Sequence, residues 1–271
     1  MANSISVFMQ YAKPFEGTKG RGTMSQIDVD LSEARRDMAA LFRWTARERL
    51  HEGIANHFSM AVSSDGQQFL MNPYGIHFSK IKAGDLLLMD ATQEPDKEVL
   101  DKGLVDITAW GIHGAMHRNN PGARVILHLH SPYATAFSCL QDLTLPAIDQ
   151  TTARFFNRLV VDSGFDGMGI GEEGERLSRL LGNKRLVVMG NHGVLTAAAT
   201  PAIAWDLMYH MEIGCRNYML ASASGHALSV MSDDVAEKTA QQWEDYEKHA
   251  YHHLAAIRRI LDEEEPEYAL I

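Results

Sequence analysis

Apolar and polar positions recur with two different periods along the chain, and these periods predict a succession of helices and strands. Helical spacing follows capping residues such as Asp30 and Ser131, and predicts helices at 30–52, 106–119, 131–140, 172–181, 201–224 and 232–264. Short apolar runs between turn residues predict strands at 58–63, 67–72, 85–90, 125–130 and 185–190. The pattern is that of an α/β protein whose helices gather at the C-terminal end.

The domain organisation predicted from the chain is simple. Residues 1–29 include a stretch rich in glycine and polar groups, so we expect a flexible N-terminal arm. No internal repeat or composition shift divides the rest, and residues 30–271 are predicted to form a single domain. The acidic run DEEEPE near the end is expected to be a solvated tail.

Charge and hydropathy exclude several classes of partner. A formal charge of −10 argues against nucleic acid and anionic membranes, although local cations and a metal can still attract a small anionic substrate. No apolar run is long enough to cross a membrane and no signal peptide is recognised, so a cytoplasmic protein is expected. Cys139 and Cys215 lie in apolar contexts and are predicted to be buried thiols.

Candidate chemistry is concentrated in the string VILHLH, which ends in His128 and His130. Residues two apart point to the same face of a strand, so these two imidazoles can bind one metal ion. Among thirteen histidines a chance pair is not rare, and buried hydrogen-bonded histidines are the alternative. His192 follows a second apolar run in the same context, which favours a three-histidine metal site. Three protein ligands leave positions open for substrate and so indicate catalysis.

Four motifs give the chain a resemblance to the class II aldolase/adducin family over residues 30–225. They are GIANHFSM (53–60), NPYGIHFSKIKAGDLLLMD (72–90), NNPGARVILHLHSPYATAFS (119–138) and VVMGNHGVL (187–195). The resemblance implies a nine-stranded α/β/α fold with a central mixed sheet, and one divalent metal ion per subunit on His128, His130 and His192. It also implies a homotetramer with sites between subunits.

The acid and base of the sugar-phosphate aldolases in that family are missing from this sequence. The family's glutamate stands nineteen residues before the first metal histidine, where this chain has Ala109. The tyrosine that protonates the aldolase product aligns with Gln150, which is a poor general acid. These two departures argue against aldol cleavage.

The phosphate pocket of the aldolases is also altered. Small hydroxyl residues of the family align with Tyr74-Gly75, and a serine pair aligns with Ile107-Thr108. Asn56 and Gly75 keep the family's residues, and Tyr74 stands in place of the phosphate loop; we expect Asn56, Tyr74 and Gly75 to bind the substrate. An unphosphorylated substrate is therefore expected.

A site that keeps the metal ligands but lacks the acid and base of the aldolases fits decarboxylation. A metal chelating a hydroxyl and a carboxylate oxygen stabilises the enolate-like electron pair, and an ionised carboxylate needs no base before carbon dioxide leaves. The family contains such a branch, so the resemblance implies decarboxylation of 3-hydroxy-2-methylpyridine-4,5-dicarboxylate in vitamin B6 degradation. A decarboxylase of 3,4-dihydroxyphthalate is the alternative. Mn²⁺ is the expected ion, with Zn²⁺ as the alternative.

Four further residues are predicted to support the reaction, and each of them also has a purely structural explanation. Arg154 is predicted to bind the second carboxylate, or else to form a surface salt bridge. His113 lies one helical turn after Ala109 and is expected to orient substrate or pass a proton, or else to be a core histidine. Tyr74 either borders the aromatic ring or packs, and Asn56 either binds a carboxylate or stabilises a turn.

Two other functions remain open at this point. An aldolase or epimerase acting on an unphosphorylated substrate would need a replacement base, with Asp106 and Asp149 the nearest candidates. An adducin-like interaction module would not need the three histidines. The cluster Tyr251-His252-His253 either reaches a neighbouring subunit's site or faces solvent, and the sequence does not choose.

Overall fold

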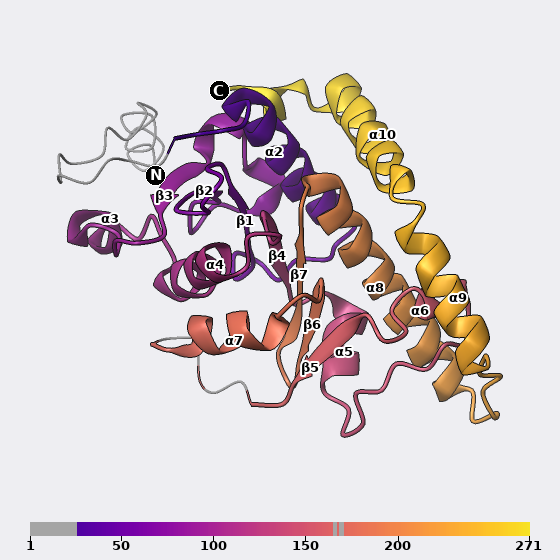
Figure 1. Ribbon diagram of the computed structural model, residues 1–271. Helices are drawn as coiled ribbons and strands as arrows, with labels where there is room; N and C mark the ends of the chain where they lie inside the picture. The colour runs from indigo at the N-terminus through magenta and orange to yellow at the C-terminus, as the bar shows by residue number, and fades with distance from the viewer. Residues whose placement is uncertain (1–25, 165–166, 168–170) are drawn as a thin grey trace.

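A single mixed sheet forms the centre of the protein in the computed structural model, which describes residues 26–164, 167 and 171–271 (Figure 1). The strands are β1 (His57–Ala61), β2 (Gln68–Met71), β3 (Leu87–Asp90), β4 (Val125–Leu129), β5 (Leu159–Asp162), β6 (Leu186–Met189) and β7 (Gly193–Ala198). Their order is β3-β2-β1-β4-β7-β6-β5, and only β5 and β6 are parallel. The predicted mixed sheet is confirmed, with seven strands over the described residues where the resemblance implies nine.

Helices cover both faces of the sheet. One face carries α2 (Leu31–Arg47), α5 (Pro132–Ser138), α8 (Pro201–Ala223) and α10 (Lys248–Glu264). The other carries α4 (Ile107–Asn119) and α7 (Glu173–Leu181), which pack together across it (Figure 1). The remaining helices are α3 (Lys97–Asp101), α6 (Gln150–Ala153) and α9 (Asp233–Glu244), with 3₁₀ turns at Phe78–Lys80, Ala83–Asp85 and Pro266–Ala269. The arrangement is the predicted α/β/α sandwich.

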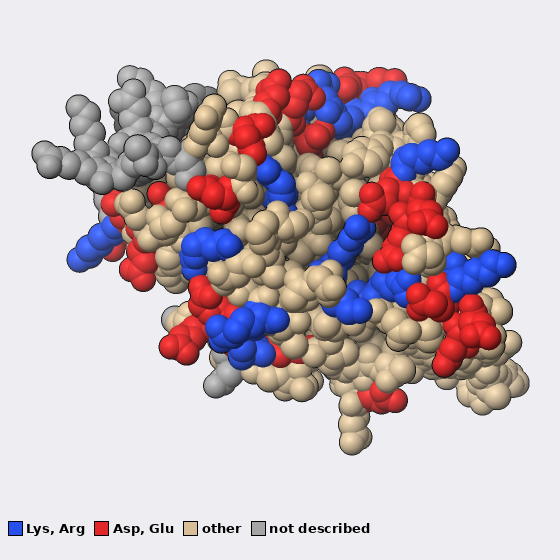
Figure 2. Space-filling model, in the orientation of Figure 1, with Lys and Arg blue, Asp and Glu red and all other residues tan. Residues whose placement is uncertain are grey.

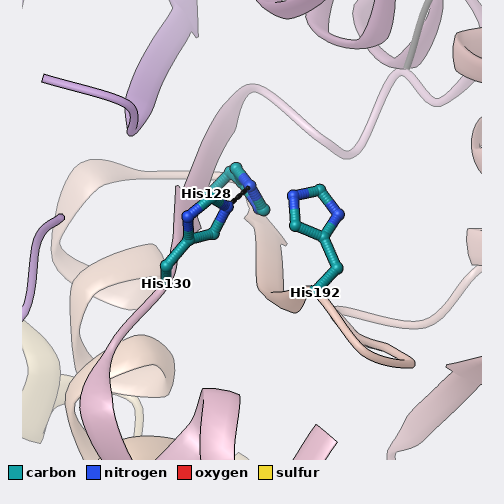
Figure 3. Close-up of side chains that lie close together, drawn as sticks. All are labelled: His128, His130 and His192. Atoms are coloured by element: carbon teal, nitrogen blue, oxygen red, sulfur yellow. Dashed lines mark hydrogen bonds between the residues drawn. The ribbon is translucent and has the colours of Figure 1, made fainter. Parts of the chain in front are cut away.

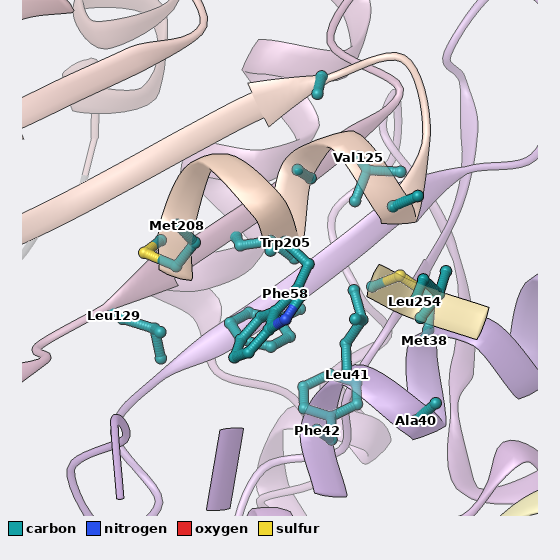
Figure 4. Close-up of a cluster of buried hydrophobic side chains, with 14 of the residues drawn as sticks. Met38, Ala40, Leu41, Phe42, Phe58, Val125, Leu129, Trp205, Met208 and Leu254 are labelled. Atoms are coloured by element: carbon teal, nitrogen blue, oxygen red, sulfur yellow. The ribbon is translucent and has the colours of Figure 1, made fainter. Parts of the chain in front are cut away.

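The alternation along β4 decides where the candidate metal ligands point. Val125, Leu127 and Leu129 join the larger core around Trp205, beneath α2 and α8 (Figure 4). Ile126 packs in the second core, beneath α4 and α7. Because successive side chains of a strand point to opposite faces, His128 shares the α4 side with Ile126.

The prediction of one long helix at 232–264 is wrong, because residues 245–247 separate α9 from α10. Ion pairs hold the two sides of this break to other elements. Arg158 binds Glu237 and Glu244 of α9, while Arg185 binds Glu247 at 2.7 Å. Contacts between distant residues do not appear in helical periodicity, so the sequence pattern missed the break.

The acidic end is not the solvated tail that was predicted. Glu265 binds Arg43 at 3.0 Å and Arg47 at 2.5 Å, both on α2, and Tyr268 is fully buried. The chain therefore ends packed against α2. Figure 2 shows Lys and Arg side chains among the acidic ones over this face, so its charge is not of one sign.

The two cysteines differ. Cys215 is buried as predicted, and burial raises the pKa of its thiol. Cys139 is exposed, which corrects its prediction, because it follows the last turn of α5 at the surface. Residues 1–25 of the predicted N-terminal arm lie outside the described residues. Among the helices of the described ranges, none has the length and apolar character to span a membrane.

Candidate metal centre

Three histidines meet where β4 ends beside the turn between β6 and β7. His128 stands in β4, His130 follows it, and His192 belongs to the turn (Figure 3). Pairing of β4 with β7 brings the turn to the end of β4, and one ring nitrogen from each histidine lies within 4.8 Å of the others. The structure thus brings together the three residues predicted as metal ligands.

Hydrogen bonds fix which nitrogen of two of these rings carries the proton. Nδ1 of His128 lies 3.1 Å from the carbonyl oxygen of Val194, and Nδ1 of His130 lies 2.6 Å from a carboxylate oxygen of Glu52. Both acceptors need a donor, so each Nδ1 carries the proton. The two Nε2 atoms, 3.0 Å apart, then face each other with lone pairs. Such facing lone pairs repel unless a cation lies between them, and oriented imidazoles of this kind are typical of metal ligands.

The surroundings also keep His128 and His192 neutral, which is the form of imidazole that binds a metal. Burial lowers the pKa of His128 well below its usual value. Burial, followed by the neighbouring His130, lowers the pKa of His192 to about 4. His128 and His192 are therefore available as ligands for a divalent ion at neutral pH.

The glycine of the NHG motif is required by close packing against this centre. A Cβ on Gly193 would lie 2.6 Å from the carbonyl oxygen of Leu129 and 3.1 Å from Cδ2 of His130. Asn191, at the start of the turn, adopts a φ of 57°, a left-handed conformation that asparagine tolerates. The motif thus lets the turn approach the end of β4 closely enough to deliver His192.

A chain of buried hydrogen bonds leads away from the three histidines. The carbonyl oxygen of Ala123, at the end of the chain, can only accept, and this decides which atom donates in every other bond. The carbonyl oxygen of Ala123 accepts from Nδ1 of His117 at 2.9 Å, so Nε2 of His117 accepts from the Ser59 hydroxyl at 2.7 Å. The Ser59 oxygen then accepts from Nδ1 of His113, and Nε2 of His113 accepts from Nδ1 of His57 at 2.7 Å. We call these residues the buried histidine chain. It leaves Nε2 of His57 as an acceptor.

His57 links the buried histidine chain to the metal centre. It pairs with His128 across β1 and β4, and their ring centroids lie 4.8 Å apart. His113 is fully buried and reaches the centre through His57. Sequence reasoning named His113 but missed His57 and Glu52, because cross-strand pairing and a contact 78 residues apart leave no local pattern.

The other predicted site residues lie in different surroundings. Asn56 is buried, its Oδ1 accepts from the backbone N–H of Glu52 at 2.7 Å, and its Nδ2 has no hydrogen-bond partner within the described ranges. Tyr74 is 40% exposed beside Gly75, whose φ is +83°. Arg154 pairs with Asp206 of α8, and the structure does not bring it into contact with the three histidines.

Buried histidines predict a stability that depends on pH. Burial lowers the pKa of His57 to about 4 and of His117 to about 3, and lowers that of His113 and His128 well below 6.5. As pH falls from 6.5 to about 4, the unfolded chain takes up protons that the folded chain does not. The free energy of unfolding should then fall by about 1.4 kcal/mol per pH unit for each such histidine.

Denaturant unfolding of the metal-free protein at pH 7.0 and pH 5.0 measures this effect. Substitution of the exposed His252 by alanine should leave the difference between the two values unchanged. Equal stability at both pH values, or greater stability at pH 5.0, would contradict the burial of neutral imidazoles.

The sequence comparisons agree with this geometry. A family model described as the class II aldolase and adducin N-terminal domain matches residues 36–219, and the chain belongs to this family. A putative aldolase class 2 protein of Caulobacter vibrioides is 31% identical over 208 residues, covering 76% of this chain and 79% of that protein. A protein named decarboxylase NovR, from Streptomyces niveus, is 28% identical and covers 78% of each chain.

A solved structure supports the fold in the same way. The aldolase II superfamily protein from Pseudomonas syringae superposes with a TM-score of 0.80 at 26% identity, covering 90% of this chain and 98% of that one. Membership of the family supports a lyase-type, metal-dependent enzyme.

Proposed function

We propose that this protein is a metal-dependent decarboxylase of a hydroxy-aromatic dicarboxylate. The observation that carries the proposal is a centre of three converging imidazoles beside α4. The resemblance places the aldolase glutamate at Ala109 of this helix, which is fully buried. The relative named as a decarboxylase supports the same reaction class. Our first candidate substrate is 3-hydroxy-2-methylpyridine-4,5-dicarboxylate, and 3,4-dihydroxyphthalate is the second.

His128, His130 and His192 would hold the ion in this proposal, for which we assign Mn²⁺, with Zn²⁺ as the alternative. When bound, a divalent ion supplies Lewis acidity toward the hydroxyl and carboxylate oxygens of the substrate. The bond between the ring and one carboxylate carbon breaks, carbon dioxide leaves, and the electron pair left on the ring carbon takes up a proton. No carboxylate base is needed to begin this reaction.

The remaining assignments concern how the chain holds the substrate. His57 would accept a hydrogen bond from the substrate hydroxyl through Nε2, and His113 would fix the orientation of His57. Asn56 would donate to a substrate carboxylate through Nδ2, which has no hydrogen-bond partner within the described ranges. Tyr74 and Gly75 would border the aromatic ring. Arg154, held by Asp206, is not assigned to this site.

The proposal also covers the oligomeric state of the protein and its location in the cell. We propose that residues 30–271 form one domain and that the protein is a cytoplasmic homotetramer. Tyr251 is exposed on α10, where it is available to a neighbouring subunit.

The alternative is an aldolase or epimerase acting on an unphosphorylated substrate. Its candidate bases are already engaged as helix caps: Asp106 accepts from Thr108 at the start of α4, and Asp149 accepts from Thr152 and Asn217. An adducin-like interaction module is a further alternative, but it gives no reason for three converging imidazoles.

Product analysis separates these functions. The protein with Mn²⁺ should release carbon dioxide from one of the two hydroxy-aromatic dicarboxylates and leave the remainder of the ring intact. Formation of carbonyl fragments from an unphosphorylated hydroxy-carbonyl compound, lost in Asp106→Asn or Asp149→Asn, would replace decarboxylation by retro-aldol chemistry.

A further inference from the structure

Two helices on the opposite face of the sheet from α4 present a second group of metal-ligating side chains. Asp206 and His210 stand four residues apart on α8, and His249 and His253 stand four residues apart on α10. Residues with this spacing share one face of a helix, and α8 packs against α10. One oxygen of Asp206 and one ring nitrogen each of His210 and His249 lie within 4.8 Å of one another.

We propose that Asp206, His210 and His249 form a second binding site for a divalent transition-metal ion such as Zn²⁺. The chemistry of the three donors fits this ion, which binds imidazole nitrogen and carboxylate oxygen. Facing helices that each contribute ligands are a known way to build metal sites in helical proteins.

Hydrogen bonds orient the proposed ligands. Nδ1 of His210 lies 2.8 Å from the backbone carbonyl oxygen of Asp206 and 3.3 Å from its Oδ1, so this nitrogen donates to Asp206 and Nε2 keeps the lone pair that would bind the ion. Nδ1 of His253 lies 3.4 Å from Oδ1 of Asp206, and Arg154 pairs with Oδ2. These contacts hold the carboxylate in place, and oriented ligands of this kind are the rule in metal sites.

The exposure of the proposed ligands agrees with this assignment. The Asp206 side chain is 5% exposed, while that of His249 is 42% exposed and leaves a path for an ion from solvent. Burial alone would raise the pKa of Asp206, but hydrogen bonds from His210 and His253 and the charge of Arg154 hold it well below its usual value. The guanidinium of Arg154 lies 4.2 Å from the ring centroid of Trp243, a cation–π contact that fixes it beside the carboxylate.

The second site does not depend on the reaction at the first. His128 points to the α4 face, whereas α8 and α10 lie on the other face with Trp205 and Leu254. An ion held between Asp206 and His249 would fasten α10 to α8. The second site can therefore be tested by metal binding and by thermal stability, and neither measurement requires enzyme activity.

The test uses the full chain with its first metal centre removed by His128→Ala and His130→Ala. Co²⁺ and Zn²⁺ are titrated at pH 7.5, with binding followed by calorimetry and by the visible absorption of Co²⁺. This variant should still bind one ion per chain and should melt at a higher temperature with Zn²⁺. Adding His249→Ala should weaken binding at least 100-fold, and His210→Ala should do the same.

His252→Ala is the matched control, because His252 is exposed on the same helix and belongs to neither group. It should leave both affinity and stoichiometry unchanged. His253→Ala should weaken binding by about 10- to 100-fold, as expected when a residue that orients a ligand is lost. The proposal is overturned if the variant lacking the first centre binds no ion, or if His249→Ala and His210→Ala, folded by circular dichroism, bind it equally well.

Discussion

Replacing His128 with alanine will remove the ion from the three-histidine centre and reduce carbon dioxide release to the uncatalysed rate. His128 is buried, and its Nε2 lies 3.0 Å from that of His130, so the substitution removes one of the three converging donor atoms. Metal content by elemental analysis should fall by one ion per chain, and His130→Ala should behave in the same way. Carbon dioxide release from the preferred dicarboxylate measures the second effect.

The control is His252→Ala, which removes an exposed histidine and should change neither quantity. Circular dichroism must show that the variants keep their helices and strands. Metal content equal to that of the unmodified protein in both His128→Ala and His130→Ala would show that the ligands are wrongly assigned.

Replacing His57 with alanine should lower kcat by about 100-fold or more while the metal remains bound, a magnitude typical of a positioned proton acceptor. The buried histidine chain makes Nε2 of His57 an acceptor, and the ring of His57 lies 4.8 Å from that of His128. Steady-state kinetics with Mn²⁺ and elemental analysis of the same sample separate loss of the acceptor from loss of the ion.

His57→Gln is the informative second variant. Its amide N–H can still donate to His113 and its carbonyl oxygen can still accept, so it should recover part of the lost activity. If His57→Ala works at the rate of the unmodified protein, His57 does not touch the substrate. If His57→Ala loses its metal, His57 acts on the ligands instead.

The sequence predicted that His128, His130 and His192 would lie together, because a simple geometric rule governs their placement. Side chains two apart on a strand share a face, and His128 and His130 follow that rule at the end of β4. His192 was predicted from the same context, a histidine after an apolar run, and the pairing of β4 with β7 places it there. Ten of the eleven predicted elements have a counterpart of the same type in the structure; the helix at 232–264 instead divides into α9 and α10.

Features that depend on distant contacts were not predictable from the pattern. Strand β7, with sequence GVLTAA, was missed because glycine and two alanines interrupt its apolar pattern, and its pairing with β4 and β6 stabilises it as a strand. The partners of His128 and His130, Val194 and Glu52, lie 66 and 78 residues away.

Arg154 was predicted either to bind a substrate carboxylate or to form a surface salt bridge, and in the structure it forms a buried ion pair instead. A guanidinium binding a carboxylate was predicted, and the carboxylate that it meets is Asp206 of the same chain. Arg154, at the end of α6, therefore lies beside the second group of metal-ligating side chains, Asp206, His210 and His249, and pairs with Asp206. Nothing in the sequence around Arg154 indicates that partner.

The most direct measurement is carbon dioxide release from 3-hydroxy-2-methylpyridine-4,5-dicarboxylate and from 3,4-dihydroxyphthalate, with added Mn²⁺ and with a chelator. Metal-dependent decarboxylation predicts rapid release from one of them, lost on chelation and restored by Mn²⁺. Absence of release from both compounds, with the ion bound at His128, His130 and His192, would contradict it.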